Sequence, residues 1–198
     1  MTDGTNILKN IWVTSDHHFG HKNIIRFCDR PFTDTDHMRE ELIMRHNSVV
    51  DHCDDVYFLG DFAFTREDEI EEILIRMNGN KHFIFGNHDK QLRKTRSPRI
   101  LTEFVWMKDY HELKIPNQSK IAPIILLHYP MYTWNRMHHG ALHFYGHTHG
   151  SVPTVAAGRG RDIGVDTNDY YPHNVRDLAA EMLKCPITEP RHEDGKRK

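Results

Sequence analysis

Five short apolar runs in this chain each end directly before a polar residue that can bind a metal ion. The runs cover 11–15, 56–60, 82–86, 121–127 and 142–146, and the residues that follow them are Asp16, Asp61, Asn87, His128 and His147. In an open α/β sheet, ligands bind in the crevice outside the carboxyl ends of the strands. If the runs are strands, the residues at their exits therefore converge in space. The sequence predicts one polar cluster to which five strands contribute.

Two histidines extend this set, because His18 lies two residues beyond Asp16 and His149 lies two residues beyond His147. On an extended or irregular backbone, residues two apart point to the same side, so each pair can face one cavity. Asp61 has two carboxylate oxygens and is the best candidate to bridge two ions about 3.5 to 4 Å apart. A solvated loop is the alternative reading of either pair taken alone.

The tetrapeptide Gly86-Asn87-His88-Asp89 follows the third run. A glycine at a strand exit permits a sharp turn, which would aim Asn87 and His88 into the same crevice. Asn87 offers a neutral carbonyl oxygen to a metal, and His88 can donate a proton or bind phosphate without coordinating the metal itself. We expect Asp89 to accept a hydrogen bond from His88 and hold its ring. A polar turn between a strand and a helix is the alternative.

Length and charge restrict the classes of function. A chain of 198 residues suits one domain, which we place at residues 1–185, followed by a charged tail at 186–198. The net charge of −2 weighs against tight binding to long nucleic acid, which depends on an excess of Lys and Arg. A small phosphate ester remains compatible with this charge. A cationic run at 90–99, directly after the His88 turn, keeps a nuclease open as an alternative.

The cysteines and the hydropathy exclude other classes. Cys28, Cys53 and Cys185 are odd in number and form no C-x-x-C pair, which argues against a disulfide framework and a thiolate zinc site. A single structural zinc site would take about four ligands, fewer than the set described above. Without a stretch of about 20 apolar residues or a targeting segment at the start, we expect a soluble, cytoplasmic protein that does not interact with a membrane.

The order of the expected elements indicates the fold. A helix is predicted from Thr33 or Asp34 to about Val50, and a second after a capping box at 65–68, with an apolar stripe at Ile70, Ile73, Leu74 and Met77. Alternation of strands and helices over the first 95 or so residues predicts βαβ units and a parallel sheet. Later strands at 103–108, 111–115, 121–127, 142–146 and 162–165 predict antiparallel pairs and a second sheet, before a last helix at 175–183.

Taken in order, five blocks resemble the calcineurin-like metallophosphoesterase family over residues 11 to about 166. The blocks are Asp16-x-His18, Gly60-Asp61, Gly86-Asn87-His88-Asp89, His128 and Gly146-His147-Thr148-His149. The stretches 15–25, 30–32, 164–166 and 171–172 resemble a small bacterial and phage branch of that family. The resemblance implies an α/β fold of the metallo-dependent phosphatase type, in which a two-sheet mixed β sandwich is flanked by helices and a dimetal site lies at the strand carboxyl ends.

The resemblance also implies the roles of the site residues. On the family pattern, one ion is held by Asp16, His18 and His149, a second by Asn87, His128 and His147, and Asp61 bridges them. His88 would be the catalytic histidine, assisted by Asp89. Mixed oxygen and nitrogen ligands without sulfur favour manganese, iron, cobalt, nickel or zinc over copper(I) or iron–sulfur chemistry, and we expect manganese among these. Contacts to substrate are predicted for the loop residues His21, Arg136, His138 and His139.

The implied reaction is hydrolysis of a small phosphodiester or phosphomonoester, with nucleotides among the candidates. Two divalent ions can lower the pKa of a shared water from 15.7 to about 7 and so create a bridging hydroxide for in-line attack. One alternative is a nuclease or an end-processing phosphatase that acts on nucleic acid. Another is a non-catalytic scaffold of the same fold, which would be expected to have lost ligands; none of the seven ligand types is replaced here.

Overall fold

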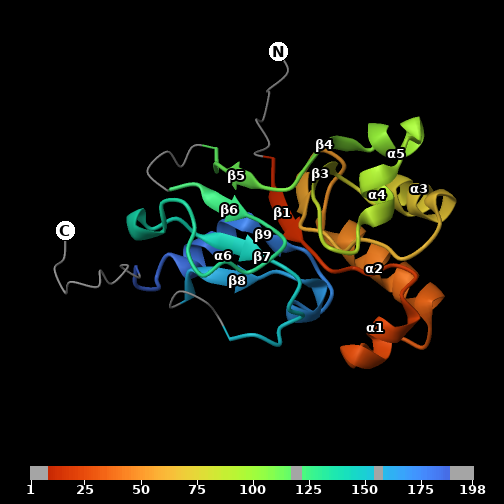
Figure 1. The fold of residues 1–198 in the computed structure, drawn as a ribbon, viewed down its shortest axis with the longest axis horizontal. Helices are drawn as coiled ribbons and strands as arrows, with labels where there is room; N and C mark the ends of the chain where they lie inside the picture. The colour runs from red at the N-terminus through yellow and green to blue at the C-terminus, as the bar shows by residue number, and fades with distance from the viewer. Residues whose placement is uncertain (1–8, 117–121, 154–157, 188–198) are drawn as a thin grey trace, which may run out of the picture.

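The computed structural model describes residues 9–116, 122–153 and 158–187. The protein has a mixed α/β fold with two mixed sheets flanked by helices, as the sequence predicts (Figure 1). Most of the predicted charged tail, 188–198, lies outside the described residues. Within the described part of the chain, no helix is both long enough and apolar enough to cross a membrane.

The first sheet contains the predicted parallel strands. Its order is β4 (Phe104–Lys108), β3 (Asn80–Ile84), β2 (Asp55–Phe58), β1 (Ile11–Thr14) and β9 (His173–Asn174). Strands β1 to β4 are parallel to one another, and β9 is antiparallel to β1. The strand predicted at 103–108 thus extends the parallel sheet instead of forming an antiparallel pair. Its crossover consists of the two short helices α4 (Lys90–Lys94) and α5 (Pro98–Thr102).

The second sheet has the order β5 (His111–Leu113), β6 (Ile124–Leu126), β7 (His143–Tyr145) and β8 (Gly160–Asp162). Only β5 and β6 are antiparallel; β6, β7 and β8 are parallel. The strand predicted at 162–165 is therefore displaced. Strand β8 ends at Asp162, whose Oδ1 accepts a hydrogen bond from Gly164 N at 2.8 Å. The 3₁₀ helix η3 (Val165–Thr167) follows directly.

Two of the six α-helices in the described residues begin at a residue whose side chain caps them. Asp34 caps α2 (Thr35–Val49) by accepting a hydrogen bond from His37 N, and Asn174 caps α6 (Val175–Met182) in the same way. The expected capping box at 65–68 is wrong. Helix α3 (Glu67–Arg76) starts one residue later, with Arg66 at the N-cap, because the Thr65 hydroxyl donates to the Glu69 carboxylate instead. Helix α1 (Lys22–Phe27) follows the first strand's exit.

Side chains on the two faces of the first sheet are buried in two different apolar cores. Val56 and Phe58 pack on one face against the predicted stripe of α3, which is buried. Leu59 faces the other way, into a core shared with Leu126 and Phe144 of the second sheet and with α6. Helices α1 to α5 accordingly lie on one side of the first sheet and the second sheet lies on the other (Figure 1).

The strand exits of both sheets meet at one edge. The backbone N–H of Asp16 donates to Gly60 O at 3.0 Å, and that of Gly146 donates to His128 O at 2.9 Å. Ser15 and Gly164 form a parallel bridge that joins the ends of β1 and β8. Gly60 is essential to this approach: its φ is +92°, and a Cβ there would lie 2.4 Å from Gly86 N.

We therefore predict that Gly60→Ala prevents folding or lowers the free energy of unfolding by more than about 3 kcal/mol, because strain and a backbone clash combine. Gly140→Ala is the matched control: Gly140 has φ +86°, but the nearest atom to a Cβ would be 3.4 Å away. Strain alone costs about 1 kcal/mol there. Urea unfolding of both variants measures the difference, and equal losses would contradict the role assigned to close packing at Gly60.

Candidate metal centre

Asp16, His18 and His149 form one group of possible metal ligands. Their ligand atoms all lie within 4.8 Å of one another. Asp16 and His18 come from the loop after β1, and His149 from the loop after β7. The ring centroids of His18 and His149 are 5.1 Å apart, and His18 Nε2 is 4.0 Å from Asp16 Oδ1. Asp16 and His18 are buried, whereas His149 is partly open to solvent.

A second group comprises Asp61, His128 and His147, again with ligand atoms within 4.8 Å of one another. Asn87 joins this group, because its Oδ1 is 3.1 Å from His128 Nε2. Asp61 Oδ2 is 3.6 Å from His128 Nε2 and also 3.7 Å from His18 Nε2 of the first group. The structure thus brings all seven predicted metal ligands to one edge of the fold, with Asp61 between the two groups.

The hydrogen bonds behind the histidines leave their ligand nitrogens free. His128 Nδ1 lies 2.7 Å from Leu59 O, an acceptor, so Nδ1 carries the proton and Nε2 has a lone pair. This Nε2 faces Asn87 Oδ1, a second acceptor, and a cation bound between them would satisfy both atoms. His149 Nδ1 is likewise 2.7 Å from Asp166 Oδ2. A histidine that binds metal typically has its other ring nitrogen bonded in this way.

The buried ring of His18 and the buried carboxylate of Asp16 would both be stabilised by a nearby cation. Both ring nitrogens of His18 are buried and lack a hydrogen-bond partner in the described part of the chain. Burial raises the pKa of Asp16 to about 8; nearby His149 opposes this shift, and the carboxylates of Asp61 and Asp162 add to it. A buried carboxylate and an unpaired imidazole are costly alone and are stabilised by a bound divalent cation. The donor set therefore fits metal ions at both groups.

Glycines leave room for the two buried carboxylates. A Cβ on Gly86 would lie 2.3 Å from Asp61 Oδ1, and one on Gly146 would lie 2.3 Å from Asp16 Oδ2. The glycine of the Gly86-Asn87-His88-Asp89 motif thus provides space at the site. Any larger residue at these two positions would displace a predicted ligand.

The paired ligands converge on an irregular backbone, the second of the two possibilities that their spacing allows. Asp16 and His18 have φ of 60° and 53°, and His147 and His149 have φ of 70° and 47°. These backbones are left-handed, not extended. Asp61 is also left-handed, with φ of 51°, so five of the seven predicted ligands share this conformation. Such strain in non-glycine residues gathers at functional sites.

Arg30 holds the first group in place and was not predicted as a site residue. It is buried, donates to Asp16 O and His17 O at 2.8 Å each, and forms a bidentate pair with Asp166 at 2.7 and 2.8 Å. Asp166 in turn binds His149. One guanidinium therefore connects the loop after β1 to the His149 ring. The only sequence signal for this pair is that Arg30 and Asp166 lie in the stretches 30–32 and 164–166, which carry part of the family resemblance.

His88 and Asp89 are placed differently from expectation. Asp89 is buried, and its carboxylate accepts hydrogen bonds from the backbone N–H groups of Asp61, Phe62 and Gly86 at 2.6 to 2.9 Å. These groups, and not His88, are its partners in the described part of the chain, so the expected Asp89–His88 hydrogen bond is wrong. His88 N donates to Asp61 Oδ1 at 2.9 Å, and His88 Nε2 is 4.0 Å from Asp61 Oδ2.

The predicted substrate contacts fall into two places. His21 lies beside the first group, with its ring centroid 5.5 Å from that of His18. Arg136, His138 and His139 are exposed at the 3₁₀ helix η1 (Met137–His139). In the described residues, no hydrogen bond, ion pair or ring contact joins these three to the metal ligands, and their role stays a prediction.

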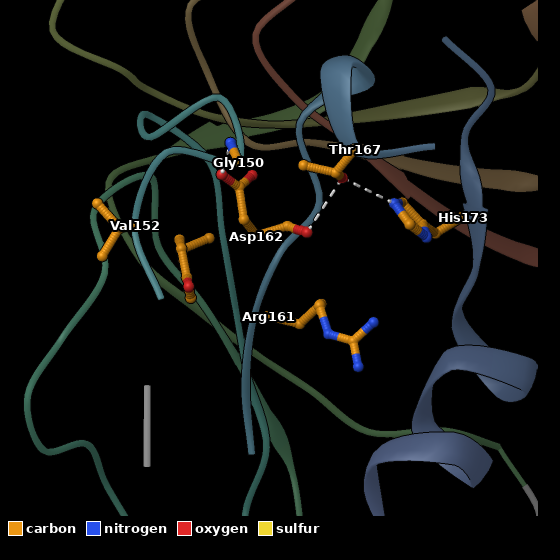
Figure 2. A pocket seen from close by; sticks show the side chains of 7 residues that line it. Gly150, Val152, Arg161, Asp162, Thr167 and His173 are labelled. Atoms are coloured by element: carbon orange, nitrogen blue, oxygen red, sulfur yellow. Dashed lines mark hydrogen bonds between the residues drawn. The ribbon is translucent and has the colours of Figure 1, made fainter. Parts of the chain in front are cut away.

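A separate cavity of about 160 Å³ lies behind the loop that carries His149. Figure 2 shows Thr167 at its rim, with its hydroxyl 3.2 Å from Asp162 O and 3.4 Å from His173 Nε2. Its lining also includes Tyr145 and Arg161, and none of the seven predicted metal ligands. Asp162 links the two regions, because its carboxylate accepts a hydrogen bond from Gly150 N, next to His149, at 2.9 Å.

Comparison with known proteins yields relatives without a described function. No protein-family model matches the chain. An uncharacterized protein of Methanocaldococcus jannaschii is 43% identical over 91 residues, which cover 45% of this chain and 52% of that protein. The chain thus spans about half the length of this relative. The Gene 66 protein of Mycobacterium phage D29 is 26% identical over 196 residues, covering 89% of this chain and 96% of the phage protein.

Among solved structures, a protein of unknown function from Aquifex aeolicus has the same fold. It aligns with a TM-score of 0.64 and 22% identity, and the alignment covers 87% of this chain and 99% of that one. A predicted phosphoesterase from Streptococcus pneumoniae aligns over 79% of this chain and 71% of its own, with 18% identity and a TM-score of 0.36. That score is too low to indicate a shared fold.

We predict that Arg30→Met lowers the free energy of unfolding by about 3 kcal/mol or more, because Asp166 and two backbone carbonyls would be left buried without a partner. Arg39→Met is the control, since Arg39 forms only surface ion pairs on α2 and should cost less than about 1 kcal/mol. Urea unfolding measures both variants. Similar small losses would show that Arg30 does not hold the site together.

The raised pKa of Asp16 predicts how metal-free stability depends on pH. Between pH 4 and pH 8 the unfolded chain has released the Asp16 proton while the folded chain retains it, so folding weakens as pH rises. From pH 5 to pH 8, the metal-free parent should lose about 3 kcal/mol relative to Asp16→Asn, which has no such proton. Urea unfolding in EDTA tests this. A parent–variant difference that is constant with pH contradicts a neutral buried Asp16.

Proposed function

We propose that this chain is a dimetal-dependent phosphoesterase of the calcineurin-like metallophosphoesterase family, and that its substrate is a small phosphodiester or phosphomonoester such as a nucleotide. The observation that carries the proposal is the position of Asp61. Its Oδ2 is 3.7 Å from His18 Nε2 and 3.6 Å from His128 Nε2, so one carboxylate is shared by two ligand groups. A single structural ion would need only about four ligands.

In this proposal Asp16, His18 and His149 hold one ion, Asn87, His128 and His147 hold the other, and Asp61 is common to both. Oxygen and nitrogen donors without sulfur suit manganese, with iron, zinc, nickel or cobalt as alternatives. Two bound divalent ions lower the pKa of a water molecule to about 7 and offset the charge of the phosphoryl oxygens.

His88 is the proposed general acid. Its side chain is 46% exposed, so a substrate can reach it, and its backbone N–H is fixed by Asp61 Oδ1. The imidazole would hydrogen bond a phosphoryl oxygen or protonate the leaving group, a role that typically contributes 10²- to 10⁴-fold. Asp89 acts as a positioning residue, because the backbone N–H groups it binds belong to the two turns that carry Asp61 and His88.

A small substrate is favoured over nucleic acid. The net charge is −2, and part of the cationic run after His88 is already paired: Arg93 contacts Asp109, and Arg99 contacts Glu71. A nuclease would be expected to leave such residues free for phosphates. A non-catalytic scaffold of the same fold is the other alternative, and it predicts that His88 can be replaced without consequence.

The test is hydrolysis of bis(p-nitrophenyl) phosphate and p-nitrophenyl phosphate with added manganese. His88→Ala should lower kcat by about 10²-fold or more while two metal ions per chain are retained, because His88 does not coordinate. Asp61→Ala should lose both activity and metal. His52→Ala is the control and should retain full activity, because this exposed histidine precedes β2, whereas Asp61 follows the other end of that strand.

Metal content measured by mass spectrometry separates the two effects. Purified, manganese-loaded parent protein that hydrolyses neither ester would refute the enzyme, and full activity in both His88→Ala and Asp61→Ala would refute the assigned site.

A further inference from the structure

We propose that the substrate is a phosphodiester with a planar aromatic group on each side of its phosphate, of the size of a dinucleotide, and that Phe64 and Tyr129 each stack on one of these groups. This inference rests on the proposed function, since it assigns the substrate class of the same site. It adds two residues that are neither metal ligands nor members of the catalytic motif.

Phe64 presents apolar surface directly beside the first ligand group. Its ring centroid is 5.2 Å from that of His18, 4.7 Å from that of His88 and 4.3 Å from that of His21, yet the residue is 38% exposed. Its backbone is fixed, because Phe64 N donates to Phe19 O at 2.8 Å. The loop thus holds a partly exposed aromatic ring next to the proposed general acid, and stacking on His21 at an interplanar angle of 20° helps to orient it.

Tyr129 occupies the corresponding position beside the second ligand group. Its ring lies edge-on to His128 and His147, with centroids 4.9 and 4.8 Å away, and the residue is 42% exposed. Its backbone carbonyl lies 3.2 Å from Nε2 of the buried His143 ring. Each ligand group therefore has one exposed aromatic ring on a fixed backbone.

The positions of these rings relative to Asp61 suggest the shape of the ligand. Asp61 lies between the His18 and His128 rings, so a phosphoryl group held there has Phe64 on the side of one ligand group and Tyr129 on the side of the other. Aromatic side chains bind nucleobases and aryl groups by stacking, with little dependence on the base. One ring for each arm of a diester suits two planar groups, and the net charge of −2 gives no support for a longer polyanion.

Hydrolysis of diesters that share the p-nitrophenolate leaving group tests the two rings separately. With thymidine 5′-(p-nitrophenyl phosphate) or bis(p-nitrophenyl) phosphate, which have two planar arms, Phe64→Leu and Tyr129→Leu should each lower kcat/KM about tenfold, the size expected for one stacked ring. With methyl p-nitrophenyl phosphate, which has one planar arm, only one of the two variants should have this effect.

Tyr132→Leu is the control, because this aromatic residue is 93% exposed and has no ring contact in the described residues. It should leave all three rates within about twofold of the parent. If Phe64→Leu and Tyr129→Leu reduce hydrolysis of the methyl ester and of the two-ring esters by equal factors, the rings only support the histidines and the inference fails.

Equilibrium binding separates this inference from the proposed function. Calorimetry of manganese-loaded protein should show that thymidylyl-(3′→5′)-thymidine binds at least about tenfold more tightly than dimethyl phosphate, and that Phe64→Leu and Tyr129→Leu each weaken the dinucleotide alone. Equal affinity for the two ligands overturns the inference even if esters are hydrolysed. A dinucleotide that binds tightly but is never cleaved supports the inference and refutes the enzyme. Affinity that rises steadily with oligonucleotide length refutes a dinucleotide-sized substrate.

Discussion

The burial of two carboxylates, Asp16 and Asp61, at the junction of two sheets is the constraint on which the rest of this structure depends. Removing a carboxylate from water costs several kcal/mol unless hydrogen bonds and positive charge replace the solvent. The chain supplies the hydrogen bonds: His147 N donates to both oxygens of Asp16, and His88 N donates to Asp61 Oδ1. It does not supply enough positive charge, since the pKa of Asp16 remains raised by burial. If the proposed metal ions bind here, their binding free energy adds directly to the stability of the fold.

Carboxylates in this protein divide into those that face the centre and those that hold its loops. Five predicted ligands adopt left-handed backbone conformations, which cost free energy in non-glycine residues. The loops keep these conformations because Asp89 binds three backbone N–H groups and Asp162 binds those of Gly150 and Gly164. Arg30 and Asp166 serve the loop after β1 in the same manner. These hydrogen bonds hold the candidate ligands in their observed positions, as a preorganised site requires.

How far the sequence predicts this site depends on the range of the interactions involved. The apolar runs and their polar exits are local patterns, and they predict most strands and the convergence of the seven candidate ligands at one edge. The predictions are wrong where a side chain binds a competing or distant partner instead of the neighbour expected from the sequence. Thr65 binds Glu69 and so does not cap its helix, and Asp89 binds the backbone of residue 61, far along the chain, in preference to its neighbour His88. Arg30 meets Asp166 across 136 residues, and no local periodicity reports such a pairing.

In the proposed function, the gradient of burial across the cluster of candidate ligands would let its inner residues hold metal while its outer residues meet the substrate. Asp16, Asp61 and His128 are nearly inaccessible, and in this low-dielectric environment their attraction for cations is strongest. His88 and His147 are exposed at the opposite side, where side chains can meet a ligand without prior rearrangement. Water must be excluded from that outer side for electrostatic stabilisation of a reacting phosphate to be effective. Phe64 and Tyr129 contribute exposed apolar surface there, so a substrate with planar arms stacked on them would help to exclude water from the reacting phosphate.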